Sequence, residues 1–322
     1  MTRSVLKRYA PRRGWNLFLL LACIFWWAGC SMVGNTTKAL QRTTKKITRE
    51  ITSADGDLKK KVGVIRFENK VSPENPSYQN VLHDGLLANL QDSCNNFIVT
   101  NPSSGGHEGG LDKLPRLATG QIDNFALAGA GRQLGLNAIV TGSLNDIAAQ
   151  DDLQGILWMK DNHYFIRVLV RLEVYDTYTG SKILDEDFPH EIEIDEMEYE
   201  LIKTNKEINP TILKEALEEI VSEIVTRTCD ALGDQSWNGY ITSVEGDKIS
   251  ISSGSEVGLA TGRVLAIYDS CQIIEGIEGC RFYRPGPQTG ELKIVKVFPQ
   301  RAEAVLVSGG GAVVGNAVRT KE

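Results

Sequence analysis

The chain has 322 residues, 42% of them hydrophobic and 24% charged, which excludes disorder as its dominant state and suits two compact domains. The first 29 residues carry five of the 35 basic residues and none of the 41 acidic ones. The rest therefore has 30 basic against 41 acidic residues, a net charge of −11. Nucleic-acid phosphates would repel such a chain, so general nucleic-acid binding is excluded.

The N-terminal segment has the pattern of a signal peptide over residues 1–29. Basic residues precede an apolar run at residues 17–28, which is shorter than the roughly 20 residues of a permanent transmembrane helix. The run ends in Trp27-Ala28-Gly29-Cys30. This motif resembles the bacterial lipobox, although the lipobox usually has an aliphatic residue where Trp27 stands. The resemblance implies cleavage before Cys30 and covalent diacylglycerol and N-acyl lipid on that cysteine; the alternative is an ordinary cysteine after a plain signal peptide.

The residues after Cys30 suggest a location. Ser31 stands where an Asp would resemble the signal for retention in the inner membrane. We therefore expect the protein at the periplasmic face of an outer membrane, in contact with the membrane through its lipid. Residues 30–60, with seven basic side chains and few large apolar ones, are predicted to be a lipidated tether.

Cysteine content agrees with export to an oxidising compartment. Four cysteines remain after signal removal and acylation, and an even number suits disulfides. The favoured pairs are Cys271 with Cys280, which closes a short loop, and Cys94 with Cys229, at the predicted ends of two helices. Free buried thiols are the alternative. A zinc site is not supported, because there is no Cys-x-x-Cys spacing and the four histidines are scattered.

Residues 61–235 are predicted to form an α/β domain. The clearest signal is the strict alternation of apolar residues over 164–174, which indicates a long strand with one buried face. A turn at residues 176–180 and a return strand at 182–188 complete a hairpin. Pro189 is expected to place the end of that return strand at a sheet edge. Asn209 and Pro210 predict the start of a long helix. Gly135 predicts the end of a shorter helix. The other predicted elements are strands at 62–67, 97–99 and 137–142 and a helix at 78–94.

Residues 236–322 contain short β runs separated by glycine and no helical signal. The predicted strands are 240–244, 248–251, 263–268, 291–297, 302–307 and 312–319. The predicted fold class is therefore α+β, an α/β sandwich with a mixed sheet, followed by a small all-β barrel or SH3-like domain.

Two sets of motifs resemble known periplasmic modules. Lys61-Val62-Gly63-Val64 and the segment from Leu136 to Ser143 resemble a domain found in the curli secretion protein G family, in penicillin-binding-protein activator lipoproteins and in the Tol-system β-propeller protein. Trp237-Asn238-Gly239 and Val314-Gly315-Asn316 resemble the C-terminal domain of flagellar assembly protein T. The order of the two modules also agrees with that protein, although the lipobox and the insertion between Cys271 and Cys280 depart from it. The resemblance implies a module for envelope assembly.

Catalytic and metal-binding residues are not expected. His83 and His107 are predicted to be surface histidines, and none of the four histidines lies in a catalytic motif. Gly129-Ala130-Gly131 falls late in a predicted helix, where it cannot act as a dinucleotide-binding turn. We therefore predict that the protein is not an enzyme.

Two segments are candidates for contact with a partner. The four residues Ile156, Leu157, Trp158 and Met159 lie before the long strand, with packing into the core as the alternative. Residues 185–200 hold nine acidic side chains. The favoured interpretation of this segment is a solvated strand edge that discourages aggregation. The alternatives are a binding surface for a basic partner and a site for a divalent cation. The spacing of a calcium-binding loop is missing.

These features predict a non-enzymatic outer-membrane lipoprotein that binds periplasmic or outer-membrane proteins as a scaffold in envelope assembly, flagellar assembly being one setting. Homo-oligomerisation is left open. The alternative is a subunit of a curli-type secretion pore, in which the strands of residues 155–188 contribute to an oligomeric barrel. A cell-wall hydrolase is the remote third choice.

Overall fold

The computed structural model describes residues 58–71, 76–102, 111, 113–156, 159–205, 208–270 and 272–321. All of them belong to one compact unit, residues 54–322. The predicted signal peptide, Cys30 and most of the predicted tether lie outside the described residues. Leu58 is already buried in a hydrophobic core. Within the described residues, no helix combines the length and the apolar character that crossing a membrane requires.

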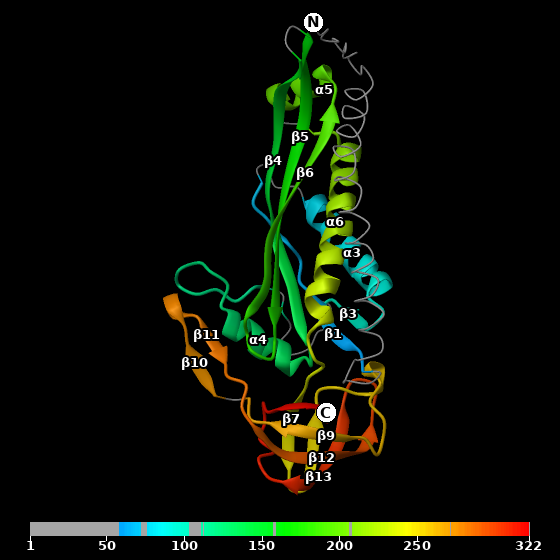
Figure 1. The fold of residues 1–322 in the computed structure, drawn as a ribbon, viewed down its shortest axis with the longest axis vertical. Helices are drawn as coiled ribbons and strands as arrows, with labels where there is room; N and C mark the ends of the chain where they lie inside the picture. Colours follow the sequence, from blue (N-terminus) through cyan, green and yellow to red (C-terminus); the bar gives the residue numbers. More distant parts are fainter. Residues whose placement is uncertain are drawn as a thin grey trace, which may run out of the picture. The chain divides into compact units, whose positions relative to one another are not determined.

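A mixed sheet forms the first half of the unit, as predicted (Figure 1). Its strand order is β3-β1-β4-β5-β6, and the short strand β2 also pairs with β4. β1 runs parallel to β3 and β4, whereas β4, β5 and β6 form an antiparallel meander. The strand bounds are β1 Lys60–Val64, β2 Glu68–Asn69, β3 Phe97–Thr100, β4 Ala138–Ile156, β5 Met159–Asp176 and β6 Lys182–Ile194.

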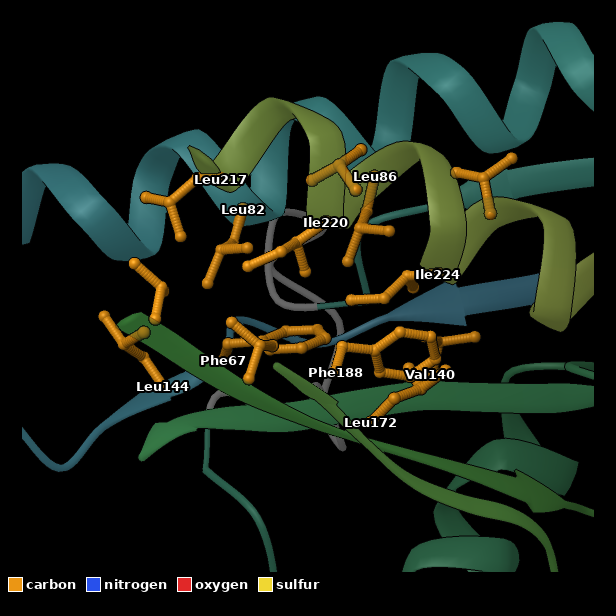
Figure 2. Close-up of a cluster of buried hydrophobic side chains, with 14 of the residues drawn as sticks. Phe67, Leu82, Leu86, Val140, Leu144, Leu172, Phe188, Leu217, Ile220 and Ile224 are labelled. Carbon is orange, nitrogen blue, oxygen red and sulfur yellow. The ribbon is translucent and has the colours of Figure 1, made fainter. Parts of the chain in front are cut away.

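The alternation in β5 produces the core, as expected. Every second side chain from Ile166 to Val174 is buried, with at most 1% exposure, and faces the helices α3 (Pro76–Ser93) and α6 (Pro210–Gly233). Figure 2 shows the leucines and isoleucines of these helices above Leu172 and Phe188 of the sheet and above Phe67, which lies between β1 and β2. Burial of each such side chain contributes about 1.5–3 kcal/mol, so this interface is the main source of stability in the region.

Local signals placed the helix ends correctly. The Asn209 side chain accepts a hydrogen bond from the Thr211 amide at 3.0 Å and Pro210 opens α6. Helix α4 (Asn124–Gln133) ends before Gly135, which has a φ of 69°. A further helix, α5 (Glu196–Asn205), was not predicted. Its buried residues, Tyr199 and Ile202, belong to the same hydrophobic core as β5.

A disulfide joins α3 to α6. Cys94 directly follows α3 and Cys229 lies in the last turns of α6, with 5.8 Å between their Cα atoms. The predicted pairing of these two cysteines is therefore present. Cys271 lies outside the described residues, so the pairing of Cys271 with Cys280 stays a prediction.

Two strands run farther than predicted. β4 does not end at Gly142 but continues to Ile156, because it pairs with β5 along its whole length. The return strand is also longer than the predicted range 182–188, whereas its predicted place at a sheet edge is confirmed. β6 continues to Ile194, and Pro189 lies opposite Leu169. β6 is the last strand of the sheet, where a missing backbone N–H costs least.

The second half is a closed six-stranded barrel with the order β12-β13-β8-β7-β14-β9, as the fold class predicted. Trp237 is fully buried and packs in its core with isoleucines and leucines from the strands. An unpredicted hairpin, β10–β11, is inserted between β9 and β12. The bounds are β7 Gly239–Glu245, β8 Lys248–Ile251, β9 Val264–Tyr268, β10 Ile273–Glu275, β11 Arg281–Tyr283, β12 Gln288–Val297, β13 Ala302–Gly309 and β14 Ala317–Thr320.

Candidate functional site

A polar cleft lies on the face of the sheet opposite α3 and α6. Since β5 side chains alternate between the two faces, burial of Leu172 and Val174 under the helices directs Arg171, Glu173 and Tyr175 to the other face. The cleft has a volume of about 630 Å³. Its lining is Glu68, Lys70, Leu114, Arg116, Gln121, Ile122, Asn124, Gly142, Ser143, Asn145, Arg171, Glu173, Tyr175, Ser181, Lys182, Cys280 and Phe282.

The inserted β10–β11 hairpin forms one wall of the cleft. The Tyr283 amide donates to the Thr179 carbonyl at 2.8 Å, and the Tyr283 ring stacks on Phe125 with 4.5 Å between centroids. Asn124 Nδ2 donates to the carbonyls of Gly180 at 2.8 Å and Arg281 at 2.7 Å. These contacts hold the hairpin against the turn that follows β5.

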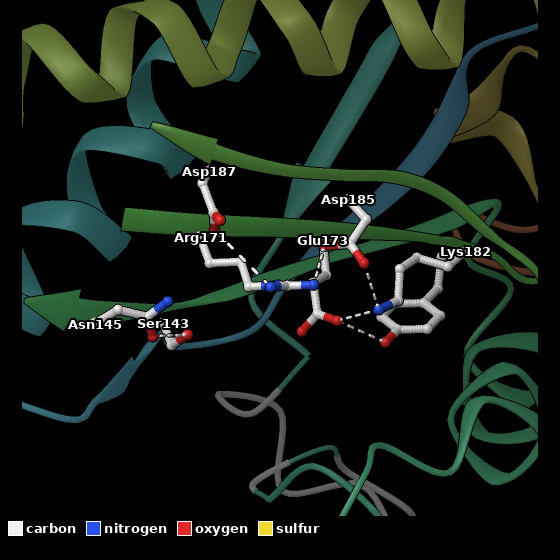
Figure 3. A network of polar contacts seen from close by, with 8 residues as sticks. Ser143, Asn145, Arg171, Glu173, Lys182, Asp185 and Asp187 are labelled. Atoms are coloured by element: carbon white, nitrogen blue, oxygen red, sulfur yellow. Dashed lines mark hydrogen bonds and ion pairs between the residues drawn. The ribbon is translucent and has the colours of Figure 1, made fainter. Parts of the chain in front are cut away.

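Ion pairs order the charged side chains along β5 and β6 (Figure 3). Arg171 pairs with Asp185 at 2.7 Å, and Lys182 contacts Glu173 at 2.5 Å and Asp185 at 3.0 Å. Burial raises the pKa of Asp185, but hydrogen bonds from Lys182 and Arg171 outweigh this effect and hold the pKa below its ordinary value. Burial lowers the pKa of Lys182, and its bonds to Glu173 and Asp185 more than reverse that shift. Both groups are therefore charged at neutral pH.

Tyr175 is kept protonated in the same network. Burial is the main cause of its raised pKa, and the charge of Glu173 together with the hydrogen bond to it adds to the shift. The Tyr175 hydroxyl donates to Glu173 at 3.2 Å. It is thus a hydrogen-bond donor and not a general base.

The other end of the cleft carries further cations. Arg116 forms an ion pair with Glu68 and donates to the Gly120 carbonyl at 2.5 Å. Lys70 is exposed at the rim. The lining therefore has four basic and two acidic side chains, and three of the basic ones are paired with carboxylates: Arg116 with Glu68, Lys182 with Glu173 and Arg171 with Asp185.

The lining offers charged and hydrogen-bonding groups to a ligand. Ser143, Ser181 and Cys280 are the hydroxyl and thiol groups most suited to nucleophilic attack, but no histidine accompanies them in the described lining. Lys182 is held in its charged form and cannot accept a proton. The described residues also contain no group of three histidine, cysteine or acidic side chains suited to a metal ion.

A second feature is an arm formed by the distal parts of β4 and β5. β1 pairs with β4 only as far as Val140 and β2 as far as Leu144, whereas β5 pairs with it to Ile156 (Figure 1). Along residues 145–156, no other described strand pairs with the outer edge of β4. Side chains 151–155 and 160–162 of the arm are all exposed.

The arm is braced on one face by α5. The Tyr199 hydroxyl donates to Asp151, and the Tyr199 ring lies 4.6 Å from that of Tyr164 between centroids. Lys203 lies 3.9 Å from the same aspartate. β6 pairs with β5 as far as Tyr164, which lies opposite Asp151, so the arm is three-stranded up to that point and only its tip, residues 152–156 with 159–163, is a two-stranded ribbon.

The candidate contact residues Ile156, Leu157, Trp158 and Met159 fall at the end of this arm. Ile156 and Met159 are the last register pair of β4 and β5. Leu157 and Trp158, and the side chains of all four residues, lie outside the described part of the chain, so their role as contacts stays a prediction.

The histidine prediction was partly wrong. His83 is only 2% exposed, because α3 turns it inward, where Nε2 lies 3.0 Å from Asn101 Nδ2. Burial lowers its pKa, so it is neutral near pH 7. His107 lies outside the described residues.

The acidic segment of residues 185–200 is divided between two environments. Its first part is on β6, an edge strand of the sheet, where Arg171 of β5 pairs with Asp185 and Asp187, and Glu193 lies 2.6 Å from His163 Nδ1. Its second part forms α5. The placement on a strand edge agrees with the favoured interpretation.

Sequence reasoning missed most of the cleft. It recognised Arg171 and Glu173 only as the polar side of a strand, and it gave no role to Asn124, Arg116 or Lys182. The alternation in β5 was the one available signal, because it assigns the odd-numbered residues to a single face. The partners on other elements have no local signature.

No protein-family model matches the chain, and no curated protein matches it. A hypothetical protein from Chlamydia trachomatis is 16% identical, with a TM-score of 0.36 over 54% of this chain and 98% of that one. The PelC dodecamer from Paraburkholderia phytofirmans is 9% identical, with a TM-score of 0.30 over 52% and 87%. Lipoprotein GNA1162 from Neisseria meningitidis is 13% identical, with a TM-score of 0.27 over 52% and 99%. At these values the likenesses establish neither a family nor an activity.

Proposed function

We propose that the protein is a non-enzymatic outer-membrane lipoprotein, anchored through lipid on Cys30, that binds protein partners in the periplasm as a scaffold for envelope assembly. The observation that carries the binding role is the exposed arm of β4 and β5. Leu153 on this arm is 60% exposed, although it belongs to a regular strand. An apolar side chain exposed beside the unpaired edge of β4 suits contact with another protein.

The edge of β4 favours a particular mode of binding. An edge strand offers backbone N–H and C=O groups to an incoming extended segment, which adds as a further strand. Residues 145–156 include Asp146, Asp151 and Asp152 and no basic residue. A partner strand with basic side chains therefore complements this edge in charge.

Photo-crosslinking in cells tests the role of the arm. We expect a photoreactive amino acid at Leu153 to give a discrete covalent adduct with another envelope protein. The same group at Val307, a barrel residue with 55% exposure, should give none. Changing Asp146 and Asp152 to lysine should reduce the Leu153 adduct, because the basic partner would then be repelled.

Equal labelling at Leu153 and Val307, or no adduct at either, would count against a docking arm. Ring-shaped oligomers that conduct ions across membranes would instead support the secretion-pore alternative. Adducts made only between copies of this chain would identify the arm as a self-association surface.

The anchor has a separate test. We expect Cys30→Ser to leave the membrane fraction and to incorporate no labelled fatty acid, because the acyl chains supply the attachment. The neighbouring change Ser31→Ala is the control and should remain lipidated and membrane-bound. A Cys30→Ser protein that still incorporates lipid would contradict the proposed anchor.

A further inference from the structure

The register of the β10–β11 hairpin keeps Cys280 away from the segment that carries Cys271. Cys280 is a free thiol and lies opposite Gly276, whose amide donates to the Cys280 carbonyl at 2.8 Å. Gln272, the neighbour of Cys271 in the chain, lies four residues before Gly276. Its carbonyl accepts a hydrogen bond from the Arg284 amide at 2.7 Å. The paired part of the hairpin therefore lies between the two cysteines.

This separation is too large for a disulfide. Four residues of extended strand span about 13 Å. Adjacent Cα atoms are about 3.8 Å apart, so the Cα atoms of Cys271 and Cys280 are no closer than about 9 Å while the hairpin is intact. A disulfide needs Cα atoms within about 7 Å of each other. The disulfide that the sequence favours and the β10–β11 pairing therefore exclude each other.

β11 is fixed to the rest of the molecule, whereas β10 is held by β11. Tyr283 contacts Thr179 and Phe125, and the Arg281 carbonyl accepts a hydrogen bond from Asn124, so β11 is anchored on two sides. All three residues of β10 are exposed. Among the described strands, only β11 pairs with β10. Because an isolated two-stranded hairpin is only marginally stable in water, β10 can detach while β11 stays in place.

Detachment of β10 would change one wall of the cleft. Phe282 and Cys280 both line the cleft. A Cβ at Gly276 would lie 2.8 Å from Phe282 Cε2, so the ring of Phe282 packs directly against this glycine. Moving β10 and Gly276 away removes that support. The state of the two cysteines is thereby connected to the shape of the cleft.

We propose that Cys271 and Cys280 make the hairpin redox-sensitive: β10 pairs with β11 while both are thiols, and a disulfide between them detaches β10. The oxidant is a small disulfide such as oxidised glutathione. The Cys280 thiolate attacks one of its sulfurs, which breaks the S–S bond and releases one glutathione. The Cys271 thiolate then attacks the Cys280 sulfur of the mixed disulfide and releases the second glutathione. Two cysteine thiols are oxidised, one glutathione disulfide is reduced, and the two protons pass to the released glutathiones.

Residue-resolved hydrogen exchange of the full-length, detergent-solubilised protein in reduced and in oxidised glutathione tests the proposal. We expect oxidised glutathione to produce a pair of peptides linked through Cys271 and Cys280. The amides of Gly276 and Arg284 should then lose their protection from exchange, because their acceptors belong to the opened hairpin. The Tyr283 amide is the internal control and should stay protected, since its acceptor lies outside the hairpin.

Two matched variants separate the disulfide from other effects of the oxidant. Cys271→Ser and Cys280→Ser each leave a single cysteine in this region, so neither can form the bond. Both variants should keep the protection of the Gly276 and Arg284 amides in reduced and in oxidised glutathione. Peptide mapping should find the bond between Cys94, which is 7% exposed, and its partner in every sample.

A linked pair of peptides together with full protection of the Gly276 and Arg284 amides would overturn the proposal. So would the absence of the linked pair in oxidised glutathione, or an equal loss of protection in the serine variants. The inference requires neither the lipid anchor nor the docking arm, so the crosslinking and fractionation results are decided separately from it.

Discussion

Replacing Arg132 with leucine is expected to lower the free energy of unfolding by about 3–5 kcal/mol, because buried carbonyls would lose their donor. Arg132 is 5% exposed. Its guanidinium donates to the carbonyls of Thr177 at 2.9 Å, Tyr178 at 2.5 Å and Ser270 at 3.0 Å. It also lies 3.5 Å from the centroid of the Tyr283 ring. One side chain thus joins α4 and the turn after β5 to the barrel and to the hairpin.

Equilibrium unfolding in urea measures this effect. Arg132→Lys should also be destabilised, since an ammonium group does not reproduce the planar arrangement of guanidinium donors. The control is Arg227→Leu, which removes a 3.1 Å pair with Glu186 at a half-exposed α6 position and should cost about 0–1 kcal/mol. Equal stability of the Arg132 and Arg227 variants would show that the Arg132 contacts do not hold the junction.

Removing the disulfide with Cys94→Ser and Cys229→Ser is expected to lower the free energy of unfolding by about 3–5 kcal/mol. The two cysteines are 135 residues apart. Their bond therefore greatly restricts the unfolded chain, and a large loop gives a large entropic effect. The bond also fixes the end of α3 against the last turns of α6.

Non-reducing urea unfolding of the double variant and the natural chain gives this difference directly. Thiol labelling before unfolding is the accompanying control, because neither Cys94 nor Cys229 should react in the natural chain. Reaction of both thiols in the native protein, or coincident unfolding curves, would contradict a stabilising disulfide.

Elements with a strong local pattern were predictable. The cap and proline of α6, the glycine after α4 and the alternation in β5 each act over a few residues, so neighbouring side chains are enough to identify them. The continuation of β4 beyond Gly142 was not predictable in this way. Residues 145–156 are polar and weakly alternating, and their strand conformation depends on pairing with β5.

The Gly129-Ala130-Gly131 segment shows the same limit. The position of this segment late in a helix was predicted, but the structural reason for a glycine at position 131 was not. A Cβ at Gly131 would lie 2.6 Å from Thr177 Cγ2, so the glycine allows α4 to approach the turn after β5. The contact joins residues that are far apart in the chain, and no short-range pattern records it.

The sequence by itself determined the fold class, the helix caps, the core face of β5 and the even set of cysteines, because each depends on residue type and short-range spacing. Tertiary structure decided which faces meet. The order of the strands, the depth of Arg132 and the open edge of β4 arise from contacts between distant segments. Which side chains are buried, and which backbone and side-chain groups form hydrogen bonds, is decided only when those segments pack together.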